Sequence, residues 1–197
     1  FVLTMFTKVP KLYEDEVDVA TTNGVALNDT SNTSLIDETT TDDGLAAQEI
    51  IASPITGQAM PLSEAPDEVF ASGAMGKGIA VEPTEGVVYA PVNATVTTIF
   101  PTGHAIGLTT ENGAEILIHI GLDTVNLDGK GFEKLVENNQ QVEAGQELVR
   151  FDIDLIKEAG YETVTPIVVT NTGNYSDVLV TNDSEIQQGD YLFTTVK

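Results

Sequence analysis

Short apolar runs rich in β-branched residues, separated by turn residues roughly every ten positions, dominate the chain from residue 49 onward. Helical patterning is confined to residues 131–137 and 154–160, each about two turns long. This spacing predicts an all-β fold, an antiparallel sandwich or barrel with short helical turns, rather than alternating βαβ units. The runs predicted to be strands are 78–81, 86–89, 95–100, 115–120, 147–151, 166–170, 177–181 and 191–196.

Two pairs of segments within this region are similar to one another. Residues 142–148 resemble residues 186–192, and residues 53–57 resemble residues 90–94. Each pair combines a turn residue with apolar residues that enter a strand, as expected of a duplicated hairpin sandwich. Chance similarity between generic turns is the alternative.

The first 48 residues have a different composition. The chain starts at Phe1 rather than Met, so we expect a piece of a longer protein. Its first six residues are apolar and are followed by Lys8 and Lys11. They are too few to cross a bilayer, which needs about 20 residues, but they fit the end of a membrane helix with cytoplasmic lysines. A stray hydrophobic segment or cloned overhang fits equally well.

Residues 14–48 are acidic and polar without periodicity, which predicts a flexible linker. The predicted organisation is therefore a segment 1–48, made of the end of a membrane segment and this linker, followed by a folded domain 49–197. No complete signal peptide or transmembrane span is present in the sequence.

Composition excludes several classes of function. The chain carries 31 Asp and Glu against 8 Lys and Arg, a net charge of −23, so it would repel nucleic acids. It has no cysteine, which excludes disulfides, thiolate metal sites and cysteine nucleophiles. The only imidazoles in the sequence are His104 and His119, and any imidazole chemistry must use them.

The strand around His119 predicts how this side chain is presented. Because side chains alternate along a strand, Leu117 and His119 share one face, while Ile116, Ile118 and Ile120 share the other. The isoleucine face is expected to point into the core and His119 to point outward. A hairpin turn at residues 111–113 would then bring His104 towards His119.

Three chemistries suit such a pair. Zinc binding would need further ligands beyond two imidazoles, for which Glu115 and Asp123 are the nearby candidates, although no HExxH spacing is present. General acid–base catalysis and covalent catalysis by a ring nitrogen are the other two. A hydrogen-bonded structural histidine is also compatible with the pattern.

One segment carries a specific resemblance. Residues 115–132, EILIHIGLDTVNLDGKGF, resemble the signature of the glucose-family enzyme IIA domain of the bacterial phosphoenolpyruvate:sugar phosphotransferase system (PTS). The resemblance extends over residues 49–197, through Thr102-x-His104 and the segments 54–57, 66–70, 76–80 and 90–92. It implies a β-sandwich of the duplicated hybrid motif type and a phosphotransferase component of a sugar permease.

The resemblance also implies roles for individual residues. His119 would be phosphorylated through its Nε2, His104 would hydrogen-bond the phosphoryl oxygens, and Thr102 would orient His104. The domain would need no cofactor beyond the covalent phosphoryl group and no metal of its own, although the two histidines could share a zinc ion with a partner.

An apolar rim around the histidines, flanked by two acidic residues, would dock the partners. Leu117 lies where relatives can be aromatic and Gly73 where they can have lysine, so contacts at these two positions are expected to differ. The rim residues are Val69, Phe70, Ala74, Met75, Phe100, Leu117 and Val125, and the acidic residues, which would pair with basic side chains of the phosphocarrier HPr, are Asp67 and Asp123.

The implied partners are HPr, which would donate the phosphoryl group, and a IIB domain, which would receive it and phosphorylate a sugar. The sugar would be met only indirectly, and the membrane only through a fused permease domain whose C-terminal part is this chain, on the cytoplasmic side of the cell membrane. Two rival interpretations are a zinc-dependent hydrolase and a biotinyl- or lipoyl-like carrier. The carrier is disfavoured because no lysine of residues 49–197 lies in a Met-Lys-Met-like context.

Overall fold

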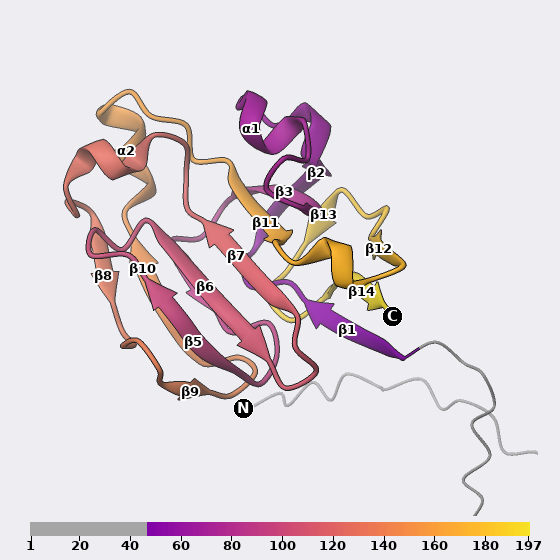
Figure 1. The fold of residues 1–197 in the computed structure, drawn as a ribbon. Coiled ribbons are helices and arrows are strands. Elements are labelled where there is room, and N and C mark those ends of the chain that lie inside the picture. Colours follow the sequence, from indigo (N-terminus) through magenta and orange to yellow (C-terminus); the bar gives the residue numbers. More distant parts are fainter. Residues whose placement is uncertain (1–46) are drawn as a thin grey trace, which may run out of the picture. The chain divides into compact units, whose positions relative to one another are not determined.

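The computed structural model describes residues 47–197, which fold mainly into β-strands (Figure 1). The predicted end of a membrane helix and nearly all of the predicted acidic linker lie outside the described residues. The strands are β1 (Gln48–Ala52), β2 (Gly57–Pro61), β3 (Lys77–Pro83), β4 (Val87–Tyr89), β5 (Ala94–Ile99), β6 (Ala105–Thr110), β7 (Glu115–His119), β8 (Phe132–Lys134), β9 (Gln141–Val142), β10 (Glu147–Phe151), β11 (Thr165–Val169), β12 (Asp177–Val180), β13 (Glu185–Ile186) and β14 (Tyr191–Val196).

The helices are short and lie between the strands. The two α-helices are α1 (Glu68–Ala71) and α2 (Ile153–Glu158), and the 3-10 helices are η1 (Leu62–Glu64), η2 (Thr124–Leu127) and η3 (Thr172–Asn174). None of the helices in residues 47–197 has the length and apolar character needed to cross a membrane.

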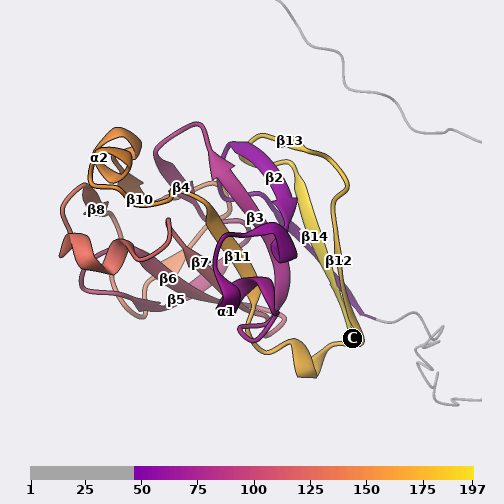
Figure 2. The same cartoon turned by 90° about the horizontal axis from the view of Figure 1, so that it is seen from above.

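The strands form three antiparallel sheets. The large sheet has the order β13-β2-β3-β11-β7-β6-β5-β9, and the two smaller ones have the orders β1-β14-β12 and β4-β10-β8. Every strand pair in the described part runs antiparallel. The β1-β14-β12 sheet lies at one side of the domain and β5 and β6 at the other, as Figure 1 and Figure 2 both show. The predicted all-β antiparallel fold is confirmed, and all eight predicted strands are present within a residue or two of their expected ends.

The main core lies between the inner faces of the sheets. Ile118 of β7, Val149 of β10 and Phe193 of β14 are each fully buried in it, so every sheet contributes. A second, smaller core lies under η1 and α1, where Phe70 packs near Val168 of β11. Burial of a side chain such as Phe70 contributes about 1.5–3 kcal/mol. Leu117 of β7 only borders this second core, so the outer face of β7 and β6 is left open beside it.

The two pairs of similar segments occupy equivalent places. β9 and β10 are joined by a turn like the one between β13 and β14. In the first turn the N–H of Gly145 donates to the carbonyl of Ala90 at 2.8 Å, and in the second the N–H of Gly189 donates to the carbonyl of Ser53 at 2.9 Å. Ala90 and Ser53 begin the shorter pair of similar segments. The structure therefore repeats one kind of turn, but neither turn closes a hairpin, because β9 and β10 pair with other strands, and so do β13 and β14.

The helix predictions have mixed outcomes. The helix predicted at residues 154–160 is α2, capped by the Asp152 carboxylate, which accepts from the Leu155 N–H at 3.0 Å. The helix predicted at residues 131–137 is wrong, because this segment forms β8 on the edge of β10. A helix of two turns is marginal on its own, whereas pairing with β10 lets Phe132 stack on Phe151 with ring centroids 6.5 Å apart.

Candidate functional site

A hairpin between β6 and β7 brings the two histidines together. His119 is the last residue of β7 and pairs with Ala105, the first residue of β6. His104 directly precedes β6, and its carbonyl accepts from the N–H of Ile120 at 2.7 Å. The two imidazole rings are in contact, with centroids 5.1 Å apart and planes at 76°. The predicted hairpin and the predicted proximity of the two rings are confirmed.

The alternation predicted for β7 is also confirmed. Ile116, Ile118 and Ile120 are at most 1% exposed, because they face the main core. Leu117 and His119 are half-buried on the opposite face. His119 is therefore held at the surface by a strand whose other face is anchored in the core.

The Nδ1 atom of His119 donates to the carbonyl of Gly121 at 2.8 Å. A carbonyl oxygen only accepts hydrogen bonds, so the proton of the neutral ring lies on Nδ1 and Nε2 keeps its lone pair. The position of this carbonyl requires glycine, because φ is +68° and a Cβ would lie 2.6 Å from the Glu162 carbonyl oxygen. The backbone around Gly121 thus fixes which nitrogen of the neutral His119 ring carries the proton and which keeps its lone pair.

His104 has a different partner at the same ring position. Its Nδ1 lies 2.5 Å from the hydroxyl of Thr102, two residues earlier in the chain. A hydroxyl can donate or accept, so this contact is compatible with a proton on either nitrogen of His104. The side chain of His104 is only 5% exposed. The structure places the hydroxyl of Thr102 against His104, and the ring of His104 against that of His119, which is the arrangement that the resemblance implied.

Both imidazoles are held in the neutral form at neutral pH. Burial, followed by the repulsion from His119, lowers the pKa of His104 to about 4. Burial also lowers the pKa of His119, while the hydrogen bond to Gly121 and the charges of Asp67 and Asp123 oppose that shift. Neutral rings are required of a nitrogen nucleophile.

Aromatic rings and apolar side chains surround the pair. The ring centroid of Phe70 lies 5.3 Å from that of His119, and the centroid of Phe100 lies 5.2 Å from that of His104. Phe70 is the buried residue of α1, so it supports the imidazole rather than presenting a free surface. The exposed positions among the predicted rim residues are Val69, Ala74, Met75, Phe100 and Val125, while Leu117 is half-buried.

The two acidic residues flank His119 from different elements. Asp67 caps α1 by accepting from the N–H of Phe70 at 3.1 Å, so it also has a local structural role. Asp123 precedes η2 in the left-handed region with φ of 57°, a conformation that aspartate tolerates better than most residues. Pairing of either carboxylate with a basic partner stays a prediction.

The metal-site alternative gains no support from the ligand set. Among residues 47–197, no group of three or more His, Cys, Asp or Glu side chains is arranged to hold a metal ion. The two histidines alone would supply only half of a tetrahedral zinc shell. Zinc shared with a partner stays a prediction.

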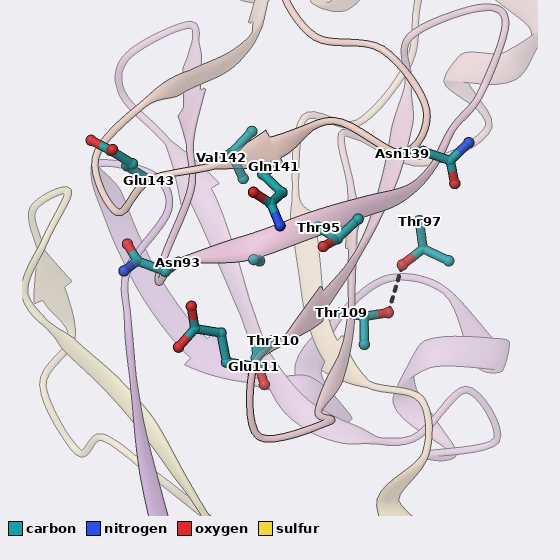
Figure 3. Close-up of a pocket in the computed structure, with 11 residues that line it drawn as sticks. Asn93, Thr95, Thr97, Thr109, Thr110, Glu111, Asn139, Gln141, Val142 and Glu143 are labelled. Carbon is teal, nitrogen blue, oxygen red and sulfur yellow. Dashed lines mark hydrogen bonds between the residues drawn. The ribbon is translucent and has the colours of Figure 1, made fainter.

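A separate polar hollow of about 640 Å³ lies away from the histidines, on β5, β6 and β9 (Figure 3). Threonine, amide and carboxylate side chains line it, including Thr95, Gln141 and Glu143, and Thr97 and Thr109 form a hydrogen bond at its wall. None of its lining residues is basic and none belongs to the predicted site. It is therefore unsuited to a phosphate group and plays no part in the imidazole site.

Sequence reasoning missed one functional group, the carbonyl of Gly121. This acceptor is a backbone atom, so no residue type marks it in the sequence. The available signal was the glycine two positions after His119, because a short turn after a strand can fold its carbonyl back onto the preceding side chain.

The described residues thus form an antiparallel β-sandwich in which two neutral imidazoles touch beside exposed apolar side chains. The chain belongs to the family described as phosphoenolpyruvate-dependent sugar phosphotransferase system, EIIA 1, whose family model matches residues 49–175. The resemblance to enzyme IIA domains is thereby confirmed.

Individual relatives agree with this assignment. The chain is 49% identical over 152 residues to a PTS system beta-glucoside-specific EIIBCA component of Halalkalibacterium halodurans, covering 77% of this chain and 24% of the relative. It is 50% identical over 125 residues to the PTS system glucose-specific EIIA component of Bacillus cereus, covering 64% of this chain and 76% of the relative. The chain thus spans about a quarter of the first relative and most of the second.

A solved structure has the same fold. The glucose permease IIA from Mycoplasma capricolum superposes with a TM-score of 0.70 and is 39% identical in sequence. The match covers 75% of this chain and 96% of that chain. It therefore extends over nearly all of the described residues and confirms the β-sandwich fold.

Proposed function

We propose that this domain is a phosphohistidine carrier that accepts a phosphoryl group from phospho-HPr on Nε2 of His119 and passes it to a IIB domain. The observation that carries the proposal is the geometry of two neighbouring rings. The Gly121 carbonyl fixes the proton of His119 on Nδ1, and the ring centroid of His104 lies 5.1 Å from that of His119. Family membership supports the same role. The IIB domain would then phosphorylate a sugar during its uptake.

In the acceptance step, the lone pair on Nε2 of His119 attacks phosphorus while the N–P bond of the donor's phosphohistidine breaks. The donor ring takes the electron pair of that bond and recovers its ordinary protonation from solvent. Onward transfer repeats this exchange, with His119 as the leaving group. Because phosphoryl transfer depends mainly on positioning and charge stabilisation, no metal is needed for the N–P exchange.

His104 suits the second task, stabilising the phosphoryl oxygens. If Thr102 donates its O–H to Nδ1, the neutral ring of His104 carries its proton on Nε2 and can donate it to those oxygens. The low pKa of His104 means that it does so as a neutral donor. The two rings then have opposite tautomers, one offering a lone pair and the other an N–H.

Acidic neighbours and the apolar rim complete the mechanism. Asp67 and Asp123 favour positive charge at His119, so they repel a phosphoryl group there and keep it easy to pass on. Exposed apolar residues such as Val69 and Val125 would be covered when a partner docks. Covering them excludes water and limits hydrolysis of the phosphohistidine.

The assembly follows from the same proposal. Relatives named EIIBCA and EIICBA components join A, B and C parts in one protein, which supports a IIB partner and a fused membrane permease for this domain. We place the domain on the cytoplasmic side of the membrane, where tethering would give IIB a high effective concentration.

The test is phosphorylation by phosphoenolpyruvate, enzyme I and HPr. The wild-type domain should gain acid-labile, base-stable phosphate, and His119→Ala should gain none, because the only nucleophilic nitrogen with a fixed lone pair is removed. His104→Gln serves as the matched control, since it should still accept the label. Labelling of His119→Ala at the wild-type level would refute the proposal.

A further inference from the structure

The turn that follows β7 carries the carbonyl that fixes the proton of His119. His119 is the last residue of β7 to pair with a neighbouring strand, so the carbonyl of Ile120 lies beyond the ladder. Gly121 then has a φ of +68° and Asp123 a φ of 57°, and the chain folds back towards Ile120. Whatever holds this turn in place therefore also acts on the nucleophilic ring.

Two buried threonine hydroxyls bind the peptide group between Ile120 and Gly121. The hydroxyl of Thr124 in η2 donates to the carbonyl of Ile120 at 2.6 Å. The N–H of Gly121 donates to the hydroxyl of Thr165 in β11 at 3.5 Å, and this hydroxyl donates its own proton to the carbonyl of Thr163 at 2.9 Å. The exposed fraction of both Thr124 and Thr165 is 0%. This first peptide group is therefore held both at its oxygen and at its nitrogen.

The next peptide group, between Gly121 and Leu122, presents its oxygen to His119. That oxygen accepts from Nδ1 of His119 at 2.8 Å, and the N–H of the same group donates to the carbonyl of Glu162 at 3.0 Å. The two peptide groups share the α-carbon of Gly121, which has no side chain to restrict rotation. Rotation of the first group would therefore change the direction of the second.

Thr124 makes two contacts that can be separated by substitution. Its methyl group lies 2.6 Å from the place that a Cβ of Gly121 would occupy, so it covers the glycine. Its hydroxyl supplies the hydrogen bond to the carbonyl of Ile120, a residue with an exposed fraction of 0%. A buried carbonyl that loses its donor keeps the full cost of its desolvation. The turn would then relax towards another donor.

We propose that Thr124 and Thr165 are positioning residues for phosphoryl transfer, which clamp the 120–121 peptide group and so aim the Gly121 carbonyl at Nδ1 of His119. This inference rests on the proposed function. Both threonines act through Gly121 rather than on the phosphoryl group. The hydrogen bonds of a histidine ring set its tautomer, so a turned carbonyl would let the proton move from Nδ1 to Nε2, where it blocks attack. Thr124 has the larger effect, because its hydrogen bond to this peptide group is the shorter of the two.

The test removes the hydroxyl of Thr124 and reads the tautomer of His119. In ¹⁵N-histidine NMR at neutral pH, the wild-type ring should carry its proton on Nδ1, whereas Thr124→Val should show a mixture of tautomers. The kcat/KM for phospho-HPr should fall about tenfold in this variant, the effect of one hydrogen bond lost at a buried group. Thr124→Ser keeps the hydroxyl without the methyl group and should restore the wild-type tautomer and most of the rate.

The matched control is Thr110→Val, at the end of β6 that lies farthest from His104. Thr110 is 4% exposed and its hydroxyl donates to the carboxylate of Glu49 at 2.8 Å, so this variant also loses a buried hydroxyl. Its melting temperature should fall, while its His119 tautomer and its rate should stay those of the wild type. A purely structural role of Thr124 would give the same histidine signals in both valine variants.

Thr165→Val is the second test variant, in which the shift towards the Nε2 tautomer should be smaller than in Thr124→Val. It decides the matter if Thr124→Val fails to fold, as judged by thermal unfolding. A His119 ring that stays fully protonated on Nδ1 in the folded variants overturns the positioning proposal alone, and so does a mixture of tautomers with an unchanged rate. A wild-type domain that takes up no phosphate overturns the proposed function, while the NMR comparison still reports on the clamp.

Discussion

His119 ends β7 with its Nδ1 against a backbone carbonyl, whereas His104 precedes β6 with its Nδ1 against the hydroxyl of Thr102. Each ring also contacts one phenylalanine, Phe70 for His119 and Phe100 for His104. The first phenylalanine is buried and the second is 41% exposed. The surroundings of His119 are thus built into the fold, while those of His104 depend on side chains near the surface.

This difference shows how two identical side chains can take different tasks. A carbonyl accepts only, so it fixes the proton of His119 on Nδ1 in the neutral ring. A hydroxyl can donate or accept a hydrogen bond, so Thr102 can stay bonded to Nδ1 of His104 whether or not that nitrogen carries a proton. In the proposed mechanism, nucleophilic attack is therefore assigned to the fixed ring of His119, and stabilisation of the moving phosphoryl group to the adjustable ring of His104.

Removal of the second imidazole, His104, is expected to have the largest effect and tests whether the two rings have different tasks. We expect His104→Gln to accept phosphate from phospho-HPr but to donate it to IIB roughly 10²–10³-fold more slowly, the usual effect of losing one positioned hydrogen-bond donor to developing charge. Single-turnover transfer from pre-labelled domain to IIB measures the second step on its own. Equal loss in both steps would show that the two rings do not divide the work.

A subtler change tests the hydroxyl alone. Thr102→Val keeps the shape of the side chain but removes the partner of His104 Nδ1, so onward donation should fall roughly tenfold, in line with the loss of a hydrogen bond to a buried group. Thr102→Ser restores the hydroxyl and should recover most of the rate. A valine variant that donates at the wild-type rate, with unchanged histidine NMR signals, would remove Thr102 from the mechanism.

The smallest expected effect concerns pH and stability. Because the pKa of His104 is lowered to about 4 in the folded domain, the unfolded chain binds protons that the folded one does not between about pH 6.5 and pH 4. The free energy of unfolding should therefore fall as the pH drops through this window, and the lowered pKa of His119 acts in the same direction.

Urea unfolding of the wild type and of His104→Gln, at pH 7 and at about pH 4.5, isolates this contribution. The loss of stability on acidification should be smaller in the variant, by on the order of 1–3 kcal/mol. Identical losses in the two proteins would mean that burial does not lower the pKa of His104.

Much of this architecture could be predicted from local patterns. The alternation around His119 correctly gave the outward face, because three isoleucines on the opposite face have no other place than the core. The turn residues at 111–113 likewise predicted the hairpin between β6 and β7 from a local sequence pattern. The segment 131–137 misled because its glutamate, lysine and leucine suit a helix, while the deciding interaction is pairing with β10, a contact set by tertiary structure.

The remaining features of the site depend on groups that the residue types do not show. The carbonyl of Gly121 is a backbone atom, and its orientation is set by the neighbouring Glu162 segment. The approach of Phe70 to His119 joins residues far apart in the chain, and only the family resemblance placed it there.

The position of the phosphoryl group is the most direct test of the central claim. In a domain labelled with ¹⁵N-histidine and phosphorylated by phospho-HPr, phosphorus should couple to Nε2 of His119, while Nδ1 of the same ring keeps its proton. His104 should carry its proton on Nε2 and show no coupling to phosphorus. Phosphorus attached to Nδ1 of His119, or to either nitrogen of His104, would contradict the account.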